Sequence, residues 1–165
     1  MSEVIILKKK SYLAMIRNAA KGRVYMFRNL YATVDGVETD ILHDGQVSCA
    51  VFVSAILYLQ NAPIELNGGT RWISSTHATV VSTEKDMKQN GWVLIEELRE
   101  GAVITWEPIT YEDGAIHGHI GFYVGNNLAV SNMSNGAGVP SEHDATYGDT
   151  RKIAHIWWHP VLDEE

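Results

Sequence analysis

One stretch of the chain, residues 47–60 (VSCAVFVSAILYLQ), is apolar on nearly every face. It is longer than a usual strand, so it predicts a buried α-helix despite its valine content. A helix that is apolar all round has to be covered by other elements on several sides. The 165 residues are enough to supply them within a single domain over 1–165.

The segments around this helix change in kind along the chain. Residues 9–21 carry apolar side chains at helical spacing, residues 26–45 are rich in turns, and residues 83–89 are typical of a short surface helix. Five short β-type runs then follow, at 92–95, 102–106, 116–124, 128–132 and 153–158. Helices followed by strands predict an α+β domain, with the buried helix against an antiparallel sheet of about five strands.

Composition excludes several classes of protein. A net charge of -7 argues against a nucleic-acid partner, which would require a basic surface. No apolar run reaches the ~18–20 residues that a membrane span needs. The apolar run at the start precedes the lysines Lys8–Lys10, which is the reverse of a secretory signal. We therefore expect a cytoplasmic protein, or one exported by a route that the sequence does not show.

The single cysteine, Cys49, lies where the buried helix begins, with Ser48 or Asp44 placed to cap it. Free N–H groups at a helix start favour a thiolate, so this position predicts a lowered thiol pKa. A lone cysteine beside an apolar helix is more often a small buried hydrophobe. The cysteine cannot form an internal disulfide, because it has no partner.

A histidine on a glycine-rich strand changes this interpretation. His119 has Gly118 and Gly121 close on either side, which leaves room for another backbone or a ligand. It follows the cysteine by 70 residues. A helix-start cysteine and a strand histidine match the arrangement in which an imidazole takes a proton from a nucleophilic thiol.

The run 119–126 (HIGFYVGN) resembles the histidine strand of the NlpC/P60 cysteine peptidases, a bacterial, papain-like family of thiol proteases that cut peptidoglycan stem peptides. Residues 91–92 (GW) and 98–106 (LREGAVITW) are similar to the segment before that strand, and the resemblance covers about 26–160. The family usually has Asp-Cys-Ser-Gly at the nucleophile, where this chain has Ser-Cys-Ala-Val at 48–51.

The resemblance implies a papain-like fold and a hydrolase of amide bonds in a peptide or peptidoglycan fragment, with no cofactor. Cys49 would be the nucleophile and His119 the base, in preference to His117 on the same strand face. A tyrosine upstream of the cysteine often binds the oxyanion in this family, which points loosely to Tyr31. Other candidates for substrate binding are Ser48 and His77.

The third member of the site depends on a hairpin register. If residues 126–127 form a two-residue loop, Asn132 faces the histidine, and Cys–His–Asn is the papain-type set. If the loop includes Gly125, the register slips by one and Ser131 takes that place. The match to the family favours Ser131, and the chemistry slightly favours Asn132.

Two other functions compete with this one. His117 and His119 lie two apart on a strand, and such a pair can bind zinc together with His77, His143 or Asp144. A metal-dependent hydrolase of this kind would also need upstream ligands, which the sequence lacks, so we expect no metal. A non-catalytic binding module is compatible with the altered residues around Cys49.

Overall fold

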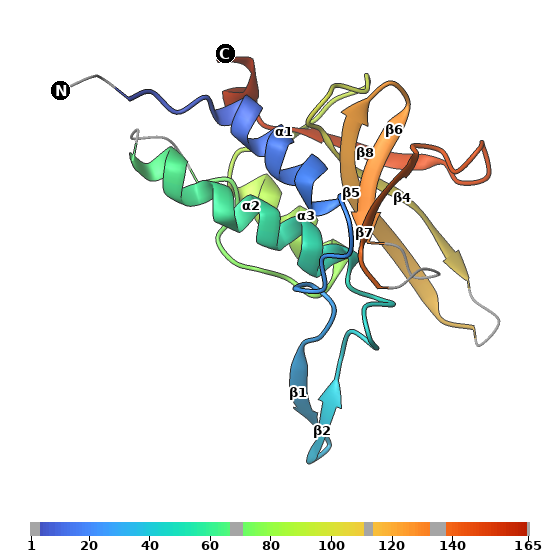
Figure 1. The fold of residues 1–165 in the computed structure, drawn as a ribbon. Helices are drawn as coiled ribbons and strands as arrows, with labels where there is room; N and C mark the ends of the chain where they lie inside the picture. The colour runs from blue at the N-terminus through green and yellow to red at the C-terminus, as the bar shows by residue number, and fades with distance from the viewer. Residues whose placement is uncertain (1–3, 67–70, 111–113, 133–137, 165) are drawn as a thin grey trace.

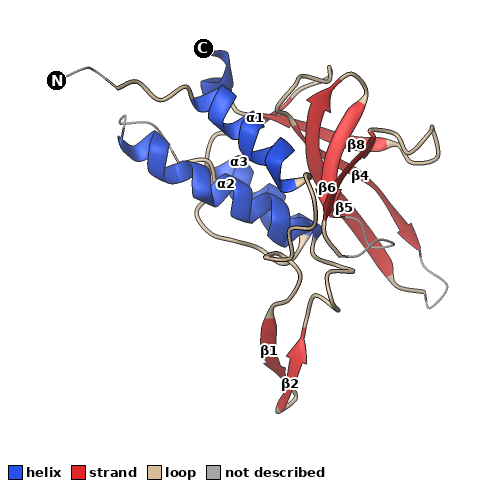
Figure 2. Cartoon of the chain, viewed as in Figure 1, coloured by secondary structure: helices blue, strands red, loops and turns tan. Residues whose placement is uncertain are grey.

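The computed structural model describes residues 4–66, 71–110, 114–132 and 138–164. In this part of the chain, three helices lie against one side of a six-stranded sheet, and a two-stranded hairpin projects away from both (Figures 1 and 2). The fold is therefore α+β. The helices are α1 (Lys8–Ala19), α2 (Cys49–Leu66) and α3 (Val80–Gln89), with a 3-10 turn at Pro160–Asp163.

The main sheet is antiparallel and has the strand order β3-β8-β4-β5-β6-β7. All five predicted runs are strands, namely β3 (Val93–Leu94), β4 (Val103–Thr110), β5 (Ile116–Gly125), β6 (Leu128–Asn132) and β8 (Ile153–Trp158). The expected number of five is one too few. The additional edge strand β7 (Pro140–Asp144) has a polar sequence without apolar alternation, so it gave no strand signal.

Helix α2 is the buried helix that its apolar sequence predicts, and it packs on β5 and β6. Phe52 of α2 meets Phe122 of β5 edge to face, with ring centroids 5.5 Å apart, and Tyr12 of α1 meets the same Phe122 at 5.7 Å. This contact fixes the start of α2 over the middle of β5. No helix of the described residues is both long enough and apolar enough to cross a lipid bilayer.

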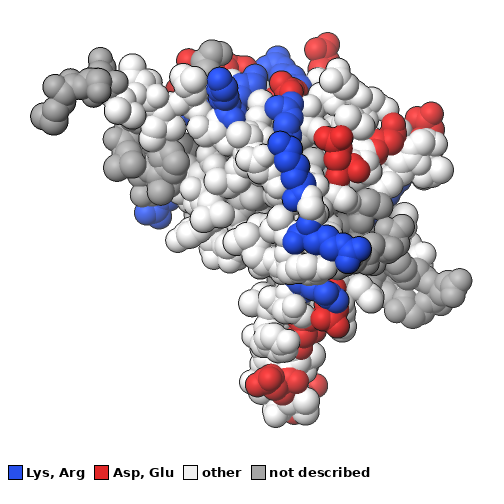
Figure 3. All heavy atoms as spheres, viewed as in Figure 1, with Lys and Arg blue, Asp and Glu red and all other residues white. Residues whose placement is uncertain are grey.

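The hairpin of β1 (Tyr31–Val34) and β2 (Val37–Asp40) was predicted only as a turn-rich segment. Asp35 and Gly36 form its tip, both with positive φ angles, as a tight hairpin turn requires. Its side chains are largely exposed, and acidic side chains mark the tip (Figure 3). A strand pair with little apolar alternation and no burial gives a weak sequence signal.

The register between β5 and β6 decides which polar residue faces His119. Residues Asn126 and Asn127 form a two-residue loop, and Gly125 pairs with Leu128. A bulge between Tyr123 and Gly125 then shifts the pairing by one residue, so that Phe122 stands opposite Val130. The loop is therefore that of one alternative left open by the sequence, while the bulge produces the strand pairing of the other.

The bulge brings the next pair, Gly121 and Ser131, together. A Cβ atom on Gly121 would lie 2.8 Å from the Cβ of Ser131 and 2.7 Å from the backbone oxygen of Val130. Only glycine allows this approach. Since alternate residues of a strand share a face, Ser131 lies on the same face as His119.

Candidate active site

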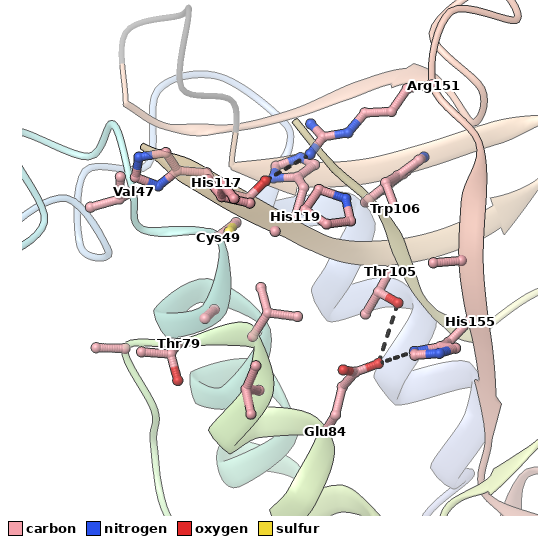
Figure 4. A pocket seen from close by; sticks show the side chains of 18 of the residues that line it. Val47, Cys49, Thr79, Glu84, Thr105, Trp106, His117, His119, Arg151 and His155 are labelled. Carbon is pink, nitrogen blue, oxygen red and sulfur yellow. Dashed lines mark hydrogen bonds and ion pairs between the residues drawn. The ribbon is translucent and has the colours of Figure 1, made fainter. Parts of the chain in front are cut away.

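A cavity of about 720 Å³ lies between the start of α2, the residues that lead into α3, and strands β4, β5 and β8 (Figure 4). Its volume is in the range of small-molecule sites. Cys49, His117 and His119 line it, as do Glu84 and Arg151. The two residues expected to carry the chemistry therefore share one cavity.

Cys49 is the first residue of α2 and is 8% exposed. The backbone N–H of Ile120, in the peptide that joins Ile120 to His119, favours the thiolate form of Cys49 and so acts to lower its pKa. The N–H of Tyr123 points toward β4, where it donates to Ala102, so the N–H of Ile120 points to the opposite edge of β5. The paired register of β5 and β6 runs as far as Phe122 and Val130, and the Ile120 N–H that acts on the thiol lies beyond this pair.

The environment of the thiol contradicts the expected lowered pKa. Burial raises the pKa of Cys49 above its ordinary value. The N–H groups of Ile120 and Ala50 and the charge of Arg151 act in the other direction without cancelling it. Desolvation therefore outweighs the effect of the helix start on the pKa of Cys49, and the resting form is the neutral thiol.

His119 is buried on the other face of β5 from the helices, where its ring lies 4.9 Å from that of Trp106. Burial lowers the pKa of this imidazole to about 3, helped by the positive charge of Arg151 and by His143. His119 is therefore neutral at physiological pH. No hydrogen bond joins it to Cys49 among the described residues, although the thiol contacts the peptide that follows it.

A chain of hydrogen bonds runs from His119 through Ser131 to His143. His119 Nε2 lies 2.9 Å from Ser131 Oγ, which lies 2.7 Å from His143 Nε2. His143 Nδ1 lies 2.8 Å from the backbone oxygen of Asp144, which can only accept. The Tyr147 hydroxyl lies beside this chain, 3.3 Å from His143 Nε2.

The carbonyl at the end of this chain sets the direction of the hydrogen on His143. His143 Nδ1 has to donate, so its neutral ring accepts at Nε2, either from Ser131 at 2.7 Å or from the Tyr147 hydroxyl at 3.3 Å. With Ser131 as the donor, which is the shorter contact, Ser131 accepts from His119 Nε2 and the lone pair of His119 is on Nδ1. This is the tautomer that a general base needs, with one ring nitrogen fixed and the other free.

Asn132, the slightly favoured third member, is directed elsewhere. It lies on the opposite face of β6, where its Nδ2 donates to the hydroxyl of Ser48. Ser48 donates in turn to the backbone oxygen of Gly45 at 2.9 Å. Both side chains are buried, and the Oδ1 of Asn132 has no hydrogen-bond partner among the described residues. This pair ties β6 to the turn before α2.

The other predicted substrate-binding residues lie outside the cavity wall. Tyr31 is 65% exposed on the projecting hairpin. His77 is hydrogen-bonded to Asp86, with 2.6 Å between Nε2 and Oδ2, and this pair holds the loop before α3. Neither lines the cavity. Ser48 also does not line it, although it adjoins Cys49.

Glu84 and Arg151 line the cavity, although nothing in the sequence placed them there. His143 was considered only as a possible zinc ligand, because the polar sequence of β7 gave no sign of the strand that carries it. Glu84 lies among other charged residues in the surface helix α3, and Arg151 lies in a polar turn. A charged residue in such a setting carries no sequence signal of its own. Their side chains become informative only when the cavity is seen (Figure 4).

No set of three or more histidine, cysteine, aspartate or glutamate side chains is placed to hold a metal ion in the part of the chain that the structure describes. Comparison with known proteins gives no family model and no curated protein that matches this chain.

Proposed function

We propose that this protein is a cysteine hydrolase with a papain-like arrangement of the NlpC/P60 kind, and that it cleaves amide bonds in peptides, with peptidoglycan stem peptides as the preferred class. The observation that carries the proposal is that Cys49 and His119, which are 70 residues apart in sequence, line one cavity, with His119 hydrogen-bonded to Ser131. Position 131 is also where the resemblance to the family places the third member.

In the proposed reaction, the sulfur of Cys49 attacks the substrate carbonyl carbon while its proton passes to Nδ1 of His119. Both groups start neutral, so proton transfer accompanies the attack instead of preceding it. His119 then gives the proton to the leaving amine, and the C–N bond breaks to leave a thioester. Water, deprotonated by His119, hydrolyses the thioester and restores the thiol.

Supporting groups follow from the same geometry. Ser131 accepts the Nε2 hydrogen of His119, and His143 orients the Ser131 hydroxyl, so the imidazole is held in the productive tautomer. The N–H groups at the start of α2, including that of Ala50, have no partner within the helix and are suited to bind the oxyanion. They replace Tyr31, which lies on the projecting hairpin.

Digestion of defined stem peptides, followed by mass analysis of the products, tests this function. We expect new fragments with the native protein, no fragments with Cys49→Ala, and no change on addition of a chelator. Loss of activity with chelator and full activity of Cys49→Ala would favour the metal-dependent alternative. Binding of the peptides without any cleavage would favour the non-catalytic module.

A further inference from the structure

Glu84 of α3 lies in the same cavity, on the wall below Thr105 (Figure 4). One of its carboxylate oxygens, Oε1, accepts three hydrogen bonds from the sheet. The donors are His155 Nδ1 at 2.7 Å, Trp157 Nε1 at 2.8 Å and Thr105 Oγ1 at 3.3 Å. The carboxylate is therefore held in one orientation by two strands before any ligand arrives.

The second oxygen, Oε2, has no hydrogen-bond partner among the described residues, and it is not one of their buried unsatisfied atoms. The Glu84 side chain is only 18% exposed. A carboxylate that is partly removed from water gains from a counter-charge at its free oxygen. Among the described residues it has one ion-pair partner, His155, which carries charge only when it is protonated.

The opposite charge in the cavity lies at its other end. Arg151 reaches over the strand that carries His119, and its Nη2 donates to the backbone oxygen of His117 at 3.3 Å (Figure 4). The cavity thus has a fixed cation near the nucleophile and a fixed anion across from it. A peptide that extends from Cys49 toward α3 would bring one of its own groups into contact with the Glu84 carboxylate.

We infer that Glu84 Oε2 binds a primary ammonium group of the peptide substrate. An ammonium group supplies hydrogen-bond donors and a positive charge. Both would act on the free oxygen of a carboxylate whose other oxygen is already hydrogen-bonded. A metal ion fits less well, since Glu84 and His155 belong to no group of three or more histidine, cysteine, aspartate or glutamate side chains placed to hold one in the described chain. The inference rests on the proposed function only in taking this cavity as the substrate site.

Binding to the Cys49→Ala protein tests the inference without turnover. The probes are the tripeptide L-Ala-γ-D-Glu-L-Lys and the same tripeptide acetylated on both amines, measured by titration calorimetry at pH 7. A charge-assisted hydrogen bond is worth a factor of about 10 or more in affinity. We expect acetylation to weaken binding at least tenfold.

Two additional variants locate the effect. In Cys49→Ala/Glu84→Gln the free peptide should bind about tenfold more weakly, and acetylation should no longer matter. In Cys49→Ala/Glu97→Gln, which removes the same charge from an exposed site, the preference for the free amine should persist. Melting curves check that the variants remain folded, and the comparison within Cys49→Ala alone needs no change at Glu84.

Equal binding of the two peptides to Cys49→Ala, binding of neither, or a preference that survives Glu84→Gln would each overturn the inference. The outcome is separable from that of the proposed function. A chain that prefers the free amine but cleaves nothing supports the ammonium site and refutes the hydrolase. A chain that cleaves stem peptides but binds both forms equally does the reverse.

Discussion

Two neighbouring polar residues on opposite faces of strand β6 have different roles. On one face, Ser131 joins His119 to His143. On the other, Asn132 joins β6 to Ser48 beneath the start of α2. Both residues are buried and hydrogen-bonded, so burial and polarity do not distinguish them. The bulge in β5 makes the difference, because it decides which residue meets the histidine.

The Ser131 face holds the imidazole of His119, so removing groups from it should alter reaction rates more than stability. The Asn132 face connects two elements, so removing groups from it should alter stability more than reaction rates.

The largest expected effect is that of the base. His119→Ala should lower kcat for stem-peptide cleavage about 10²–10⁴-fold, since a positioned general base is worth that much. His117→Ala, on the same face of β5 and lining the same cavity, should change kcat by less than about tenfold. Steady-state kinetics on both variants provides the measurement. A larger loss of kcat in His117→Ala than in His119→Ala would mean that the assignment of the β5 residues to the site is wrong.

The two faces of β6 are compared directly by Ser131→Ala and Asn132→Ala. Loss of the Ser131 hydroxyl frees the His119 ring, so we expect kcat to fall about tenfold or more with a small change in stability. Asn132→Ala should lower the free energy of unfolding by about 1 kcal/mol and leave kcat within a few-fold. Kinetics and urea unfolding of both variants decide the matter. A larger loss of kcat in Asn132→Ala would reinstate Asn132 as the third member.

A smaller kinetic effect is expected for His143→Ala, because His143 acts through Ser131. We expect a loss of kcat of a few-fold with an unchanged KM, and a mixture of His119 tautomers. Two-bond ¹H–¹⁵N spectra of the histidine rings show the Nε2–H form directly. A native-like spectrum of His119 in this variant would remove His143 from the positioning chain, whatever its effect on stability.

Much of the fold was predictable because its elements repeat a simple pattern. The buried helix, the first helix and five strands follow from apolar periodicity, and the pair of Cys49 and His119 follows from residue type and spacing. The bulge in β5 was not predictable, since it depends on how one strand adjusts to its neighbours. Strand β7 and its His143 were hidden by a polar sequence, and Glu84 by its place in a charged surface helix.

The pKa of the Cys49 thiol also depends on its surroundings in the fold. A helix start lowers the pKa of a cysteine only where desolvation is modest, and Cys49 is buried. The sequence places the residue at the helix start, but burial comes from β5 and its surroundings. Local position was therefore predictable, and the sign of the pKa shift was not.

The smallest effect near neutral pH concerns stability. The pKa of His119 is lowered to about 3 in the folded state, so above the ordinary histidine pKa of ~6.5 neither state binds its proton. Below that value the unfolded chain binds a proton on His119 and the folded chain does not. The free energy of unfolding therefore decreases as the pH is lowered, until about pH 3. We expect His119→Gln to reduce this slope by up to about 1.4 kcal/mol per pH unit.

Urea unfolding of both proteins between pH 7 and pH 4 measures that slope. Burial also lowers the pKa of His143 and His159, so part of the acid sensitivity should remain in the variant. An unchanged slope in His119→Gln would show that His119 takes up a proton in the folded state, and the neutral pair of thiol and imidazole would then be wrong.

The central claim is that Cys49 forms a bond to the substrate with the help of His119. Rapid acid quenching of the protein with a stem peptide, followed by intact-mass and peptide mass spectrometry, tests this claim most directly. We predict an added mass equal to the acyl part of the substrate, located on the peptide that contains Cys49 and absent from Cys49→Ala. Product formation by Cys49→Ala at the native rate would contradict the claim.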